Sequence, residues 1–98
     1  MAEQYLLKLY IAGRTPRAQR ALSNLQRICG QELGGRYRLE VVDVLEDPEA
    51  GERDRIVATP TLVRELPPPV RRLIGDLSDR EQVLAGLEIL PWDTEGEA

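Results

Sequence analysis

Hydrophobic and polar residues follow two different periodicities along this chain, and these periodicities predict its first elements. Residues 5–11 (Tyr-Leu-Leu-Lys-Leu-Tyr-Ile) are apolar except at Lys8, which is typical of a central strand covered on both faces. Thr15 can cap a helix whose first turn contains Pro16. Three- and four-residue spacing then predicts an apolar helix face that comprises Ala18, Ala21, Leu22, Leu25, Ile28, Cys29 and Leu33.

A second strand is predicted over residues 37–45, which are rich in valine. Gly34-Gly35 precedes it and supplies the left-handed conformation that ends a helix. The order strand, helix, strand favours a right-handed crossover between parallel strands. The outward face of the helix then carries Arg17, Arg20 and Arg27.

The middle of the chain is less regular. Asp47-Pro48 can open a short polar helix through about Arg55, although a solvated linker explains this charged stretch equally well. Residues 56–66 are predicted to form a third strand, with Pro60 in a turn whose peptide bond could be cis. Pro67-Pro68-Pro69 forces a bend, after which residues 70–74 are expected to return as a short strand.

The last regular segment has an ambiguous pattern. Ser78 and Glu81 have the spacing of a capping box, and one face of a following helix would carry Val83, Leu84, Leu87 and Leu90. Residues 82–90 also alternate as a strand would, and Gly86 lowers the helix preference by about 1 kcal/mol relative to alanine. Local sequence therefore leaves both helix and strand open here.

Size and charge limit the classes of function. The 98 residues fit one domain, expected over residues 1–92, followed by a flexible acidic tail over residues 93–98. A net charge of −4 argues against nucleic acid as a partner. No apolar run is long enough to span a membrane and no signal peptide is recognisable, so we expect a cytoplasmic protein. Twelve of the thirteen basic residues are arginine, which suits interfaces but also fits a base-composition bias of the genome.

The predicted element order is that of a thioredoxin-like α/β fold, with a βαβ half followed by a ββα half, but thioredoxin chemistry is missing. Where that fold places its two reactive thiols, this chain reads Gly13-Arg14-Thr15-Pro16. Histidine is absent, and the single cysteine, Cys29, fits the helix core. Acidic residues between positions 43 and 54 follow no metal-binding pattern and indicate a solvated face. We therefore expect no catalytic residue, metal or cofactor.

Two segments resemble the circadian clock family KaiB. They are residues 7–13 (Leu-Lys-Leu-Tyr-Ile-Ala-Gly) and the block from Ile56 to Glu81, which contains Thr59-Pro60-Thr61-Leu62 and the proline triplet. The resemblance implies a small non-enzymatic protein that binds the hexameric clock ATPase KaiC and, where KaiA exists, helps to sequester it. A clock histidine kinase is a further possible partner. It also implies a metamorphic fold: a resting homo-oligomer, dimer or tetramer, packs the second half differently from the thioredoxin-like, KaiC-binding form.

The resemblance also implies which residues act. The docking residues would lie on the first helix and second strand (Arg20, Tyr37, Arg38 and Glu40), with Arg71 and Arg72 as a further basic pair. Gly86 and Glu88 would lie at the fold switch, and Pro60 would form the structural turn. Arg38, Glu40 and Glu88 differ from the alanine, lysine and aspartate expected in familiar members. Two alternatives stay open: a sensor module related to a histidine-kinase sensor domain, and a thioredoxin-fold oxidoreductase.

Overall fold

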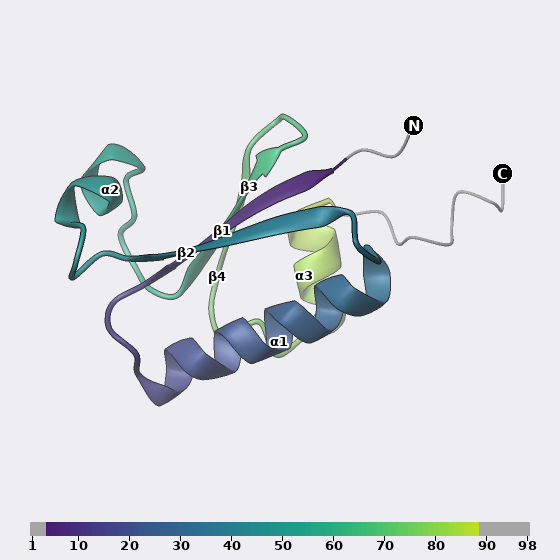
Figure 1. The fold of residues 1–98 in the computed structure, drawn as a ribbon, viewed down its shortest axis with the longest axis horizontal. Helices are drawn as coiled ribbons and strands as arrows, with labels where there is room; N and C mark the ends of the chain where they lie inside the picture. Colours follow the sequence, from purple (N-terminus) through teal and green to yellow (C-terminus); the bar gives the residue numbers. More distant parts are fainter. Residues whose placement is uncertain (1–3, 89–98) are drawn as a thin grey trace, which may run out of the picture.

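The computed structural model describes residues 4–88 and contains a four-stranded mixed sheet (Figure 1). The strands lie in the order β2-β1-β3-β4. The central strand β1 pairs parallel with β2 and antiparallel with β3, and β4 pairs antiparallel with β3. The bounds are Tyr5–Ile11 for β1, Tyr37–Asp43 for β2, Thr61–Leu66 for β3 and Arg71–Ile74 for β4. The predicted parallel pairing of the first two strands is thus confirmed.

The long helix α1 (Pro16–Glu32) forms as its sequence predicts. The Thr15 side chain accepts a hydrogen bond from the Ala18 backbone N–H at 3.0 Å, and Pro16 occupies the first turn. Every apolar position predicted for its inner face is buried or half-buried, Cys29 included. Gly34, with a φ of 62°, provides the left-handed residue after the helix.

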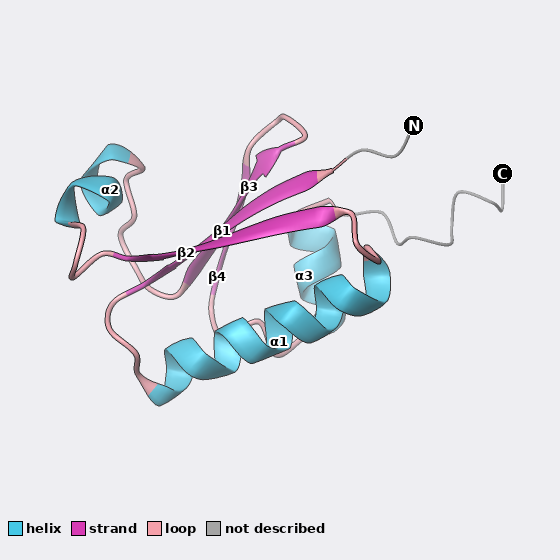
Figure 2. Cartoon of the chain, in the orientation of Figure 1, coloured by secondary structure: helices cyan, strands magenta, loops and turns pink. Residues whose placement is uncertain are grey.

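The two faces of β1 differ in cover, so the prediction that β1 is covered on both sides holds for only part of the strand. Leu7 and Leu9 are fully buried against α1 and α3 (Arg80–Gly86), whereas Leu6 and Lys8 on the other face are half-buried. Tyr10, also on that other face, is buried, and its hydroxyl donates to Asp54 just after α2 (Pro48–Arg53). Figure 2 shows α1 and α3 on the same side of the strands. The apolar run suggested full cover on both faces of β1. Leu6, however, tolerates partial exposure, and Lys8 pairs with Glu65, at 3.8 Å between nitrogen and oxygen.

The second half has the predicted ββα order with different boundaries. A short helix, α2 (Pro48–Arg53), forms in place of a linker, and the Asp47 side chain accepts a hydrogen bond from the Ala50 backbone N–H at 3.3 Å. Strand β3 begins only at Thr61, so residues 56–58 are loop where a strand was predicted. The Thr59–Pro60 peptide bond is cis. Pro60 has no N–H to donate to a ladder, which is why pairing starts after it.

The start of α3 differs from the predicted capping box. Asp79, not Ser78, is the N-cap: its carboxylate accepts hydrogen bonds from the backbone N–H groups of Glu81 at 3.1 Å and Gln82 at 3.2 Å. Ser78 instead donates its backbone N–H to the Asp76 carboxylate at 3.1 Å. The helix ends at Gly86, so this structure adopts the helical alternative over residues 80–86. Leu90 and the predicted tail lie outside the described residues.

Candidate functional site

The residues expected to dock a partner lie on two opposite edges of the sheet and on α1. Arg38 and Glu40 belong to the edge strand β2, and Arg71 and Arg72 belong to the other edge strand, β4. Arg20 is exposed on α1. The structure therefore brings Arg38 and Glu40 together but separates them from the basic pair Arg71 and Arg72.

At the β2 edge, Arg38 and Glu40 lie on the sheet face that α1 and α3 leave open. The Arg38 Nε and a Glu40 carboxylate oxygen are 3.8 Å apart, and the Arg38 side chain is 74% exposed. Both residues line a shallow hollow of about 280 Å³, together with Leu6 and Leu66. Leu66 is 49% exposed, so this edge combines charged groups with an apolar contact surface.

At the β4 edge, both arginines already bind groups of this chain. The Arg71 Nε lies 3.2 Å from a Glu88 carboxylate oxygen. Arg72 donates hydrogen bonds to the backbone carbonyls of Asp54 and Arg55, the latter at 2.9 Å. These contacts fasten the end of α2 to the sheet, where the Tyr10 hydroxyl also donates to the Asp54 carboxylate. Burial, followed by that hydrogen bond, raises the pKa of Tyr10.

The two remaining predicted docking residues differ in exposure. Tyr37 is half-buried and packs against the core on the helix-covered side of the sheet. Arg20 projects from α1 near Asp76, whose pKa is lowered mainly by hydrogen bonds from Ser78, with Arg20 and Arg17 acting in the same direction through their charge. Of the two, only Arg20 presents an exposed charged group to a partner.

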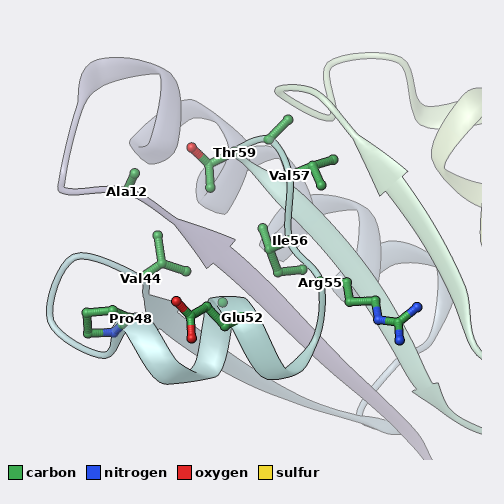
Figure 3. Close-up of a pocket in the computed structure, with 10 residues that line it drawn as sticks. Ala12, Val44, Pro48, Glu52, Arg55, Ile56, Val57 and Thr59 are labelled. Atoms are coloured by element: carbon green, nitrogen blue, oxygen red, sulfur yellow. The ribbon is translucent and has the colours of Figure 1, made fainter.

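A further hollow lies between α2 and the loop that precedes β3 (Figure 3). Its volume is about 700 Å³, and its lining is mostly apolar. Val57 beside it is 89% exposed. Sequence analysis missed this hollow because residues 56–58 were assigned to a strand; the apolar run directly before Thr59-Pro60 was the available signal. The lining consists of Ala12, Val44, Pro48, Gly51, Glu52, Arg55, Ile56, Val57, Ala58 and Thr59.

Ala12, which follows β1, and Thr59, before the cis proline, line this hollow, and its lining includes no cysteine. The segment Gly13–Pro16, where a thioredoxin-like fold would hold its thiols, is not part of that lining and contains no cysteine. Cys29 is buried in α1, and burial raises the pKa of its thiol to about 12. No group of three or more potential metal ligands occurs within residues 4–88. None of the helices in that range is long and apolar enough to cross a membrane.

Family comparisons agree with the resemblance seen in the sequence. Residues 8–89 match the KaiB domain model. The chain is 59% identical over 86 residues to the circadian clock oscillator protein KaiB of Prochlorococcus marinus (strain MIT 9312), which covers 88% of this chain and 82% of that protein. It is 57% identical over 90 residues to the KaiB of Cyanothece sp. (strain PCC 7425), with 92% of this chain and 86% of that protein covered.

Solved structures show the same fold. The N-terminal domain of Synechococcus elongatus SasA is similar with a TM-score of 0.73 and 29% identity, over 90% of this chain and 87% of that one. Mitochondrial thioredoxin 3 from Saccharomyces cerevisiae gives a TM-score of 0.70 at 18% identity, over 90% of this chain and 80% of that one. The fold is therefore thioredoxin-like, as predicted. Since the domain match runs from within β1 through α3 and the named relatives are covered over more than four fifths of their length, the chain belongs to the KaiB family.

Proposed function

We propose that this protein is a non-enzymatic cytoplasmic timing protein that binds the ring of a KaiC-type ATPase and modulates its phosphorylation cycle. The observation that carries the proposal is the KaiB domain match over residues 8–89, in which the segment Gly13–Pro16, at the thiol position of a thioredoxin, has no cysteine. Docking through exposed side chains of α1 and the β2 edge, namely Arg20, Arg38 and Glu40, fits their exposure and their few internal contacts.

We further propose that the second half changes its packing. A resting homo-oligomer would hold residues 45–90 in another arrangement, and KaiC would select the thioredoxin-like one described here, which could also sequester KaiA where it exists. Glu88 supports this idea, since its φ of 56° is unfavourable for a residue with a side chain. To shift such a balance from 1:99 to 99:1, a partner must prefer one packing by about 5.5 kcal/mol.

The likeness to the SasA N-terminal domain supports a second candidate, a KaiB-like sensor or interaction module related to a histidine-kinase sensor domain. Its identity of 29% lies well below the 59% identity to a KaiB, so the timing protein is the better supported proposal.

The proposal is tested by mixing the purified full chain with the KaiC homologue of the same organism and ATP, and following the mass of the mixture by size exclusion with light scattering. We expect a complex that forms over minutes to hours, because repacking precedes docking. Absence of a complex with ATP, with ADP and without nucleotide would contradict the proposal. An insulin-reduction assay addresses the oxidoreductase alternative, and any activity that depends on Cys29 would favour it.

A further inference from the structure

Arg64 carries a positive charge that is buried between the sheet and the helices that cover it. It lies in β3, where its register partners are Leu7 of β1 and Arg71 of β4. Cross-strand partners share a face of the sheet, so Arg64 points to the side on which α1 and α3 pack. Its residue exposure is only 4%. Burial of a guanidinium group is costly unless its donors are satisfied, which raises the question of what it binds.

The guanidinium group binds two backbone carbonyls from different parts of the chain. Its Nη2 donates to the Pro69 carbonyl at 2.7 Å, and its Nη1 donates to the Glu88 carbonyl at 3.3 Å. Its Nε has no hydrogen-bond partner among the described residues. One side chain thus connects β3, the loop before β4 and Glu88, the second residue after α3.

The charge around this contact favours the same arrangement. A backbone carbonyl oxygen carries partial negative charge and accepts a strong hydrogen bond from a cationic donor. Arg71, opposite Arg64 in the strand pair, binds the carboxylate of Glu88 with its Nε at 3.2 Å. Glu88 is therefore held through its backbone by one arginine and through its side chain by the other, while it keeps a positive φ.

We propose that Arg64 is a positioning residue that ties the C-terminal end of α3 to the β3–β4 hairpin. Because one guanidinium group holds both carbonyls, the end of α3 and the loop at Pro69 lose their contact with β3 in a single event. The first turn of α3 is held separately, by the contact between Arg80 and the buried Glu32 of α1. This inference concerns the free protein and does not depend on any partner.

The test is amide hydrogen exchange, followed by NMR, in the full-length chain with Arg64→Met, which keeps the bulk and removes the donors. We expect exchange at Leu87 and Glu88 to become at least roughly tenfold faster, since hydrogen bonds from a charged group are among the stronger ones. Exchange in β1, α1 and β2 should stay unchanged. Arg64→Lys keeps a buried cationic donor and should restore part of the protection.

Arg71→Met is the matched control, because Arg71 is the cross-strand neighbour and its ion pair with Glu88 is largely exposed. We expect a smaller effect of Arg71→Met on α3, and the contribution of Arg71 should be screened by 0.5 M salt while that of Arg64 should persist. Unchanged or slower exchange of α3 in Arg64→Met would overturn the proposal, as would equal acceleration throughout the chain. If Arg64→Met does not fold, the exchange pattern of Arg64→Lys tests the proposal instead. Wild-type exchange in β1 with faster exchange confined to α3 supports the tie, and any other pattern refutes it.

Discussion

Cys29 shows how one side chain can separate this protein from the thioredoxins whose fold it shares. The thiol lies within the core cluster between α1 and the sheet, and burial raises its pKa to about 12. A thiol attacks disulfides and alkylating reagents as the thiolate, so the folded protein holds its cysteine in an unreactive form. The packing that makes Cys29 part of the core also removes its chemistry.

We predict that Cys29 of the native protein reacts with a thiol reagent such as DTNB only when the chain unfolds. At pH 8 the labelling rate should fall well below that of the denatured chain and rise with denaturant concentration. Above pH 9, the ordinary pKa of the thiol, an unfolded chain loses the proton that the folded chain keeps up to about pH 12. Stability should therefore decrease with pH in this window, and Cys29→Ala should flatten the decrease in a denaturant titration. Fast labelling without denaturant would contradict the buried position.

The cap of α3 gives a second test of single residues. Asp79→Ala should lower the free energy of unfolding by about 1 kcal/mol, because two backbone N–H groups of the first turn lose their acceptor. Ser78→Ala is the matched control and should cost less, since the Asp79 carboxylate stays in place. Urea unfolding of both variants measures the difference. A larger loss for Ser78→Ala would instead support the capping box that the sequence pattern favoured.

Sequence predicts residues with a local role better than residues defined by distant contacts. Thr15 and Pro16 were predictable, because a cap and a first-turn proline act within one turn. Arg64 was not, since its two acceptors, at Pro69 and Glu88, meet only in the folded chain. The contacts of the docking residues were not predictable either, because nothing in the sequence indicated that Tyr37 packs against the core.

Among the elements, α3 has the weakest local basis. It has 7 residues, ends in Gly86, and buries Val83 within the helix and Leu87 just after it. A helix this short is not stable by itself in water, so its conformation depends on packing against the sheet. The alternating pattern over residues 82–90 remains compatible with a strand, which makes this segment the natural place for two arrangements.

We predict that Gly86→Ala favours the helical arrangement of α3. Alanine raises helix preference by up to about 1 kcal/mol, while its Cβ would lie 3.2 Å from a methyl carbon of Leu73, which must shift slightly. If two packings coexist, backbone NMR should show two sets of signals for residues 45–90 and one set for residues 5–40, with the helical set enriched in the variant.

Gly30→Ala is the control for this experiment. A Cβ at Gly30 meets nothing within 4 Å, so this change should stabilise α1 without altering the ratio of the two sets. A single, unchanged set of signals in all three proteins would remove the switch from the proposed function.

The elements themselves were largely predictable where the pattern was long and regular. The seven-residue β1 and the 17-residue α1 appeared within a residue of their expected bounds. The start of β3 was wrong by five residues, because β-branched residues before Pro60 favour a strand locally while the proline prevents pairing. Coverage of β1 was predicted correctly only in part, since an apolar run does not reveal that Leu6 and Lys8 stay half-buried while Tyr10 on the same face is buried.

For the molecule as a whole, the two sheet edges differ in what they offer a partner. The β2 edge presents Arg38 and Glu40 beside the exposed Leu66, whereas Arg71 and Arg72 at the β4 edge are engaged with Glu88 and the end of α2. Because the side chains at the β4 edge are already engaged, we propose that the KaiC contact lies on the β2 side and α1.

We predict that Arg38→Ala and Arg20→Ala each weaken complex formation with the KaiC homologue by roughly fivefold or more without lowering the melting temperature, as expected for exposed interface arginines. Arg72→Ala should instead lower the melting temperature, because it releases the carbonyls of Asp54 and Arg55. Pull-down titrations and thermal unfolding of the three variants separate the two effects. Loss of binding only in Arg72→Ala would move the contact to the β4 edge.

Because α1 and α3 both pack on one side of the sheet, the two halves of the chain differ in how much buried interior each would keep without the other. Tyr5, Leu7, Leu9 and Ile11 bury their side chains against α1, which is long and capped by its own sequence. If α3 detached, β1, α1 and β2 would keep this shared interior, whereas β3 and β4 would retain little of their own. In the proposed change of packing, residues 5–43 would serve as a lasting platform on which the second half is rearranged.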